Sequence, residues 1–192
     1  MKKGQSLQTP AFSRARIPDL LIKVLVHLAK IRLSRKKEAR SRMERKKFPM
    51  QRQKRIALLA HDNTKTDLVQ WAKDNKERLA HHELFATGST GEELEDELGV
   101  EVRKLLHGPL GGDLQIGGKI SEGDIDFLIF FLDPLTPVSH DTDVQALMRM
   151  AVLWNIPLAC NRASADFMIT SALMDQEYQR LLTEEIDTYG SR

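Results

Sequence analysis

From residue 55 onward, short apolar runs alternate with segments of helical periodicity, and this alternation most strongly limits the possible fold. Residues 56–60 (Ile-Ala-Leu-Leu-Ala) form a continuous apolar run, typical of a strand buried on both faces of a parallel sheet. Residues 125–132 form the strongest run of this kind. Since parallel strands need a long crossover connection, usually a helix, the pattern predicts an α/β fold.

Five strand–helix units can be placed in the sequence. The predicted strands are residues 56–60, 83–86, 101–106, 125–132 and 157–160, and the predicted helices are residues 64–75, 91–98, 116–122, 143–154 and the stretch from Ala163 onward. The third strand is polar enough to suggest an edge position. The order predicts a three-layer, open, parallel five-stranded sheet of the Rossmann or flavodoxin type, with right-handed crossovers and helices on both faces.

The formal net charge of +2 conceals a strong asymmetry. Residues 1–55 contain 18 Lys and Arg against three acidic residues, whereas residues 56–192 contain 11 basic and 24 acidic residues. Residues 17–33 are apolar around a polar face of Lys23, His27 and Lys30, which predicts a helix, and residues 35–47 form a strongly basic run. We therefore expect a basic, partly helical or disordered extension over residues 1–50 and a folded domain over residues 51–192.

The extension has three interpretations. It could bind an anionic membrane or a nucleic acid, or serve as a targeting peptide. The favoured interpretation is a dispensable extension, with Met50 as an alternative start, so that neither membrane contact nor nucleic-acid binding is expected. On this interpretation, removal of residues 1–49 leaves the activity intact.

Cysteine content and hydropathy exclude several classes of protein. The single cysteine, Cys160, permits no intrachain disulfide and no thiol-ligated metal cluster, which fits a cytoplasmic protein. No run of 18 or more apolar residues occurs, so a membrane-spanning helix is not expected.

Polar or glycine-rich residues follow every predicted strand. These segments are His61-Asp62-Asn63-Thr64-Lys65, Thr87-Gly88-Ser89-Thr90-Gly91, His107-Gly108-Pro109-Leu110-Gly111-Gly112-Asp113, Asp133-Pro134 with His140-Asp141-Thr142-Asp143, and Asn161-Arg162-Ala163-Ser164. Because ligands of open parallel sheets bind outside the carboxyl ends of the strands, these segments predict one shared binding crevice.

The segment at 87–91 joins a strand to a helix and favours a small phosphate, since helix N-termini and glycine-rich turns bind anions. It has neither the Walker spacing nor a GxGxxG fingerprint, and helix capping is the alternative. Lys65 could offer a positive charge to the phosphate, and the alternative is an ordinary exposed surface lysine. Asp113 follows three glycines, and serves a ligand or caps a helix. No spacing of His, Cys, Asp or Glu is typical of a metal site.

Two other carboxylates and a histidine belong to the segments of this crevice. Asp133 ends the most apolar strand, where burial would raise its pKa unless the carboxylate is paired. His140 could bond a substrate oxygen or face solvent, and Asp143 could cap the helix that follows it.

The loop segments, together with Trp154-Asn155-Ile156-Pro157, resemble the methylglyoxal synthase family in one register from about residue 55 to 169. The resemblance implies conversion of dihydroxyacetone phosphate to methylglyoxal with release of inorganic phosphate. It also implies no cofactor or metal, and a homohexamer in the bacterial cytoplasm. Inorganic phosphate, as a product, is then expected to inhibit.

The resemblance assigns a role to most of the loop residues. It makes Asp113 the catalytic base, with His140 at the substrate carbonyl and Asp62, Asp133 and Asp143 as supporting carboxylates. The substrate and its phosphate are placed against His61, Lys65, Thr87, Gly88, Ser89, Thr90, His107 and Gly108.

The chain departs from the family pattern at Ser89 and His107, where Thr and Ser are more usual, and no interface arginine is assigned to Arg192. The alternative function is a regulatory domain that binds a small anionic effector without chemistry, as in carbamoyl phosphate synthetase. A set of carboxylates at the crevice favours the enzyme, because a binder of anions gains nothing from them.

Overall fold

The computed structural model describes residues 19–43, 47–137, 139–182 and 186. The chain divides into two compact units, residues 1–44 and 45–192. This division lies six residues before the predicted boundary at residue 50.

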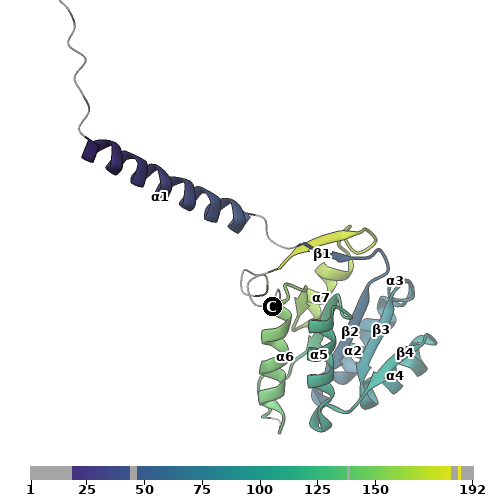
Figure 1. Cartoon of the computed structure of the whole chain (residues 1–192). Coiled ribbons are helices and arrows are strands. Elements are labelled where there is room, and N and C mark those ends of the chain that lie inside the picture. Colours follow the sequence, from purple (N-terminus) through teal and green to yellow (C-terminus); the bar gives the residue numbers. More distant parts are fainter. Residues whose placement is uncertain (1–18, 44–46, 138, 183–185, 187–192) are drawn as a thin grey trace, which may run out of the picture. The chain divides into compact units, whose positions relative to one another are not determined.

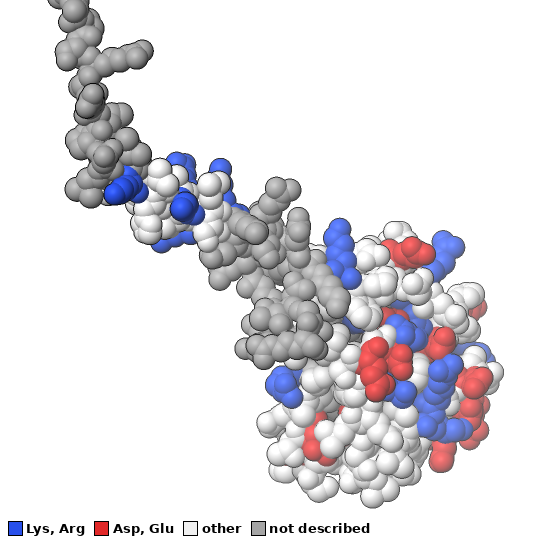
Figure 2. Space-filling view, in the orientation of Figure 1, with Lys and Arg blue, Asp and Glu red and all other residues white. Residues whose placement is uncertain are grey.

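The first unit contains one long helix, α1 (Asp19–Met43). It continues well beyond the predicted end at residue 33, because neither Gly nor Pro interrupts the basic run and Lys and Arg favour helices. Figure 2 shows basic side chains, in blue, along the coloured part of α1, with uncharged residues, in white, between them. No helix in the described part of the chain is long and apolar enough to cross a membrane.

The second unit contains the predicted parallel sheet. Its strands are β2 (Arg55–Ala60), β3 (Glu83–Thr87), β4 (Val102–Leu105), β5 (Phe127–Phe131) and β6 (Leu158–Ala159). They are ordered β4-β3-β2-β5-β6, and every neighbouring pair is parallel. The order confirms the predicted fold and the edge position of β4. The chain adds β3 and β4 on one side of β2 and then crosses to add β5 and β6 on the other side. The loops after β2, β3 and β5 therefore meet at the carboxyl end of the sheet.

Helices cover both faces of the sheet, as predicted (Figure 1). One face packs against α2 (Asp62–Asp74), α4 (Gly88–Leu98) and α7 (Arg162–Ile169), with the short α3 (Lys76–Leu79) beside them. The other face packs against α5 (Gly112–Glu122) and α6 (Asp141–Leu153). Alternate residues of the central strands point to opposite faces of the sheet. In β2, Ile56 and Leu58 pack in the layer with α2, α4 and α7, whereas Ala57 and Leu59 pack in the layer with α5 and α6.

A second, two-stranded sheet was not predicted. The sequence suggested helix from Ala163 onward, but α7 ends at Ile169 and β7 (Tyr178–Leu181) pairs antiparallel with β1 (Lys47–Met50). In this pairing Phe48 lies opposite Arg180, and the guanidinium of Arg180 lies 4.6 Å from the centre of the Phe48 ring. Arg180 is fully buried, and its burial lowers its pKa. Residues 47–50 therefore belong to the globular unit.

Candidate active site

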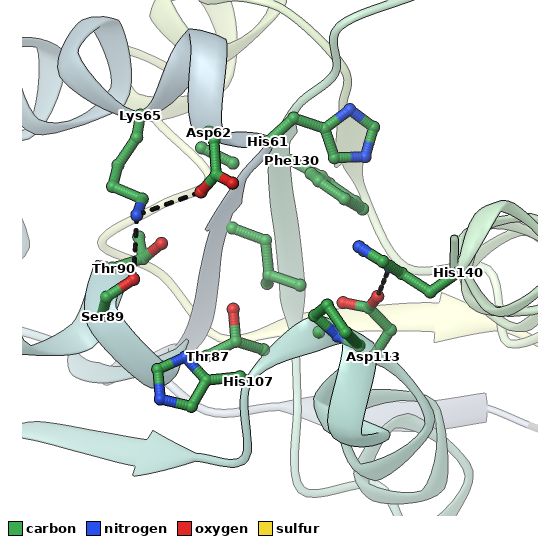
Figure 3. Close-up of a pocket in the computed structure, with 14 residues that line it drawn as sticks. His61, Asp62, Lys65, Thr87, Ser89, Thr90, His107, Asp113, Phe130 and His140 are labelled. Atoms are coloured by element: carbon green, nitrogen blue, oxygen red, sulfur yellow. Dashed lines mark hydrogen bonds and ion pairs between the residues drawn. The ribbon is translucent and has the colours of Figure 1, made fainter. Parts of the chain in front are cut away.

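A cavity of about 220 Å³ opens at the carboxyl ends of β2, β3, β4 and β5. Its lining consists of Leu59, Ala60, His61, Asp62, Lys65, Thr87, Ser89, Thr90, His107, Gly108, Pro109, Asp113, Phe130 and His140. Figure 3 shows Lys65 and Ser89 at one side of this cavity and Asp113 with His140 at the other. The segments predicted to share a crevice therefore do meet, with the exception of the one after β6.

Lys65 supplies the positive charge of the first side. It lies in the first turns of α2, and its Nζ donates to Ser89 Oγ at 2.8 Å. Its ion pairs with Asp62 and Glu93 are longer, 3.3 and 3.8 Å. Asp62 is almost fully exposed, so its charge is screened by water and leaves Lys65 able to attract an anion.

The amino end of α4 lies beside Lys65. The helix begins at Gly88, whose φ of +33° favours glycine, and no side chain caps its first N–H groups. Thr87 and Thr90 are buried at this end and line the cavity. Uncapped N–H groups, hydroxyls and an ammonium together suit a phosphate or another small oxyanion.

Two glycines in this region leave room for histidine rings. A Cβ on Gly88 would lie only 2.1 Å from Nδ1 of His107, so the imidazole occupies the space above that glycine. A Cβ on Gly108 would lie 2.9 Å from Cε1 of His140 and 3.3 Å from Oδ2 of Asp113. His107 is exposed and lines the cavity near the Gly88 turn, whereas Gly88 itself lies just behind the wall.

Asp113 and His140 form the second side. Asp113 lies in the first turn of α5, after Gly111 at a φ of +95°, and His140 directly precedes α6. His140 Nδ1 and Asp113 Oδ2 are 2.8 Å apart. Burial raises the pKa of Asp113, and the hydrogen bond and charge of His140 oppose the rise. The carboxylate is therefore a stronger base than an ordinary aspartate.

His61 lines the cavity near Phe130 and His140. Its Nδ1 accepts the backbone N–H of Asp133 at 3.0 Å, which places the ring hydrogen of the neutral form on Nε2. Nε2 is buried and has no hydrogen-bond partner among the described residues. The ring lies edge-on to Phe130 and His140, at 5.1 and 6.1 Å between ring centres. A buried donor without a partner is costly, so a ligand oxygen is its natural acceptor.

Two predicted carboxylates lie outside the cavity wall. Asp133 accepts hydrogen bonds from the side chain of Asn63 and the N–H of Leu135, which lower its pKa to about 2. The pairing explains why burial does not raise this pKa. Asp143 is partly exposed in the first turn of α6, and its negative charge contributes to the raised pKa of Asp113.

The sequence did not identify the apolar part of the wall. Leu59, Ala60 and Phe130 end their strands at the cavity, but nothing in their pattern distinguishes them from core residues. Among the described side chains, no group of three or more His, Cys, Asp or Glu could hold a metal ion.

The chain is similar to methylglyoxal synthases in sequence and structure. A family model described as an MGS-like domain matches residues 67–160. The methylglyoxal synthase of Saccharophagus degradans is 57% identical over 131 residues, which cover 68% of this chain and 85% of that protein. The methylglyoxal synthase of Cellvibrio japonicus is 50% identical over 142 residues, which cover 74% of this chain and 92% of that protein. The crystal structure of methylglyoxal synthase from Elizabethkingia anophelis matches with a TM-score of 0.71 and 45% identity, covering 77% of this chain and 96% of that one.

Proposed function

Because the chain belongs to the methylglyoxal synthase family of enzymes, we propose that it converts dihydroxyacetone phosphate to methylglyoxal and inorganic phosphate. One observation carries the proposal. A cavity sized for a small molecule has a buried base at one side, the Asp113–His140 pair, and an anion site at the other, formed by Lys65 and the Gly88 turn. A phosphorylated triose needs both.

Asp113 starts the reaction as general base. Its carboxylate takes a proton from the hydroxyl-bearing carbon beside the ketone. The electron pair of the broken C–H bond forms a C=C bond while the C=O π pair moves to the carbonyl oxygen, giving an enediolate. The buried position of Asp113 favours this step, since a raised pKa brings the carboxylate closer to the proton affinity that the transfer requires. A positioned base of this kind contributes roughly 10²–10⁴-fold to rate.

His140 and His61 stabilise the enediolate oxygen. The Nδ1 of His140 is engaged with Asp113, so the ring is held beside the carbon that loses its proton. The Nε2–H of His61 is free to donate to the oxygen on which charge develops. Fixed donors aimed at developing charge act strongly in a cavity with little water.

Phosphate then leaves from the other methylene carbon. A proton passes from the terminal hydroxyl to the enediolate oxygen, and the terminal oxygen then forms the aldehyde C=O. The C=C pair shifts to the phosphate-bearing carbon, and the C–O bond to the phosphate breaks. The enol product moves its hydroxyl proton to the new CH2 carbon and becomes methylglyoxal. Lys65, the hydroxyls of Ser89 and Thr90, and the amino end of α4 stabilise the charge that the departing phosphate gains. Free phosphate should therefore compete with the substrate.

The family resemblance adds two expectations about the protein in the cell. We infer that it works in the cytoplasm as a homohexamer. No step of the chemistry above uses a cofactor or a metal.

The purified full-length chain tests the proposal directly. It is mixed with dihydroxyacetone phosphate, and methylglyoxal and phosphate are measured separately. Release of the two products in equal amounts is expected, with competitive inhibition by added phosphate. Binding of phosphate without formation of methylglyoxal would instead indicate the regulatory anion-binding domain.

A further inference from the structure

Asn63 lies outside the cavity wall but is bonded to the segment that follows β5. It is the second residue of α2, and its Nδ2 donates to Asp133 Oδ2 at 2.7 Å and to Thr136 Oγ1 at 3.2 Å. Asp133 Oδ1 in turn accepts the N–H of Leu135 at 3.0 Å. The Asn63 amide thus ties the start of α2 to residues 133–136, far away in sequence.

The same segment carries the N–H that decides the state of His61. The backbone N–H of Asp133 donates to His61 Nδ1, so this nitrogen must keep its lone pair while Nε2 carries the hydrogen. A displaced Asp133 would leave Nδ1 without its donor, and the hydrogen could then occupy either nitrogen. With the hydrogen on Nδ1, Nε2 could only accept and would repel an enediolate oxygen.

Other bonds between α2 and β5 do not act on this N–H. Thr64 Oγ1 donates to the carbonyl oxygen of Phe131 at 2.6 Å, and the N–H of His61 donates to the same oxygen at 3.2 Å. These bonds fix the end of β5, two residues before Asp133. Among the described side chains, Asn63 and Thr136 are those whose hydrogen bonds hold the Asp133 carboxylate in place.

We propose that Asn63 is a positioning residue for the reaction: it holds Asp133 so that the Asp133 N–H keeps His61 in the form with hydrogen on Nε2. The proposal rests on the function proposed above for its effect on rate, but its structural part concerns His61 alone. Asn63 itself does not touch the substrate.

The test compares two substitutions on one helix. Asn63→Asp replaces the donating amide by a carboxylate that faces Asp133. Gln70→Glu is the matched control, because the exposed Gln70 Nε2 donates to Asp74 Oδ1 at 2.9 Å on the same helix, far from the cavity. Asn63→Ala removes the tether without adding charge, and serves if Asn63→Asp fails to fold.

Three readouts are needed on the whole protein. The ring nitrogens of ¹⁵N-labelled histidine, assigned with His61→Gln, report which nitrogen of His61 carries hydrogen. Turnover and the affinity for inorganic phosphate are measured alongside. We expect the wild type and Gln70→Glu to show the Nε2–H form alone and Asn63→Asp to show a mixture. The kcat of Asn63→Asp should fall about two- to tenfold, as for loss of one hydrogen bond, with phosphate affinity unchanged.

Either of two results would overturn the proposal. One is an Asn63 variant whose His61 keeps the Nε2–H form alone. The other is a loss of phosphate affinity that matches the loss of kcat, since this would mean general loosening of the site. If the wild type makes no methylglyoxal, the proposed function fails, while the comparison of His61 between the variants still decides whether Asn63 positions it.

Discussion

The carboxylate of Asp113 and the imidazole of His140 are 2.8 Å apart, yet they lie at the starts of different helices, α5 and α6. The two helices cover the same face of the sheet through a shared apolar core. The position of the base against its partner is therefore set by helix packing and not by a local turn.

Replacing Asp113 tests its role as the base. Asp113→Asn keeps the size of the side chain and an oxygen that can accept from His140, but it cannot take a proton. We expect kcat to fall by roughly 10²–10⁴-fold, while binding of phosphate, measured by calorimetry, stays within a few-fold of the wild type. Retention of most activity would remove Asp113 from this role.

Asp143→Asn should move the acidic limb of the pH–rate profile. Burial is the main cause of the raised pKa of Asp113, and the like charge of Asp143 adds to it. Since Asp113 must be ionised to act as a base, activity rises with pH through its pKa. Removing the Asp143 charge lowers that pKa, so the limb in kcat/KM should shift to lower pH. If the acidic limb does not move, its pKa belongs to a group other than Asp113.

Lys65→Ala should weaken the binding of phosphate and of the phosphorylated substrate. A charge-assisted hydrogen bond contributes about 1.5–3 kcal/mol, so we expect KM and the inhibition constant of phosphate both to rise about 10- to 100-fold. Lys73→Ala is the control on the same helix, since Lys73 forms an ion pair with the exposed Glu97 at 2.8 Å and does not line the cavity. Equal effects of the two substitutions would contradict an anion site at Lys65.

Gly108→Ala should disturb the contact between Asp113 and His140 without unfolding the protein. The new Cβ would press on the His140 ring at 2.9 Å, so the ring must shift away from its place beside Asp113. A displacement of this kind costs up to about 100-fold in rate, to be measured as kcat. Gly118→Ala places its Cβ in open space on α5 and should leave kcat unchanged.

Two truncations separate the extension from the globular unit. Removal of residues 1–44 should change neither turnover nor melting temperature. Removal of residues 1–49 also deletes most of β1, and with it the pairing to β7 and the contact of Phe48 with Arg180. We therefore expect the same turnover but a loss of at least about 1–2 kcal/mol, or roughly 2–8 °C or more in melting temperature. A folded protein without turnover, in either case, would contradict the expectation that the extension is dispensable.

The parallel sheet was predictable because its strands are buried on both faces and therefore apolar throughout, as in residues 56–60 and 127–131. The β1–β7 pair was not. Residues 47–50 continue a basic run and include Pro49, and their partner strand lies about 130 residues later. Neither strand has a local pattern that reveals the other, because antiparallel pairing at such a separation depends on the completed fold.

The members of the site were largely predictable, but their directions were not. Lys65, Asp113 and His140 come to the cavity because they follow strands that end there. Asp133 also follows such a strand, yet its carboxylate turns toward Asn63 and only its N–H serves the site, through His61. Which part of a residue faces a cavity depends on loop conformation, and the sequence does not encode this in its spacing.

The pairing of β1 with β7 also bears on how the protein folds during synthesis. Of the two strands, residues 47–50 emerge first from the ribosome, and they have no strand to pair with until residues 178–181 follow. Five parallel strands and the helices between them can assemble in the interval, with Arg180 still in the tunnel. Closure of this small ribbon therefore follows the synthesis of every strand of the parallel sheet, and it cannot begin before residues 178–181 are made.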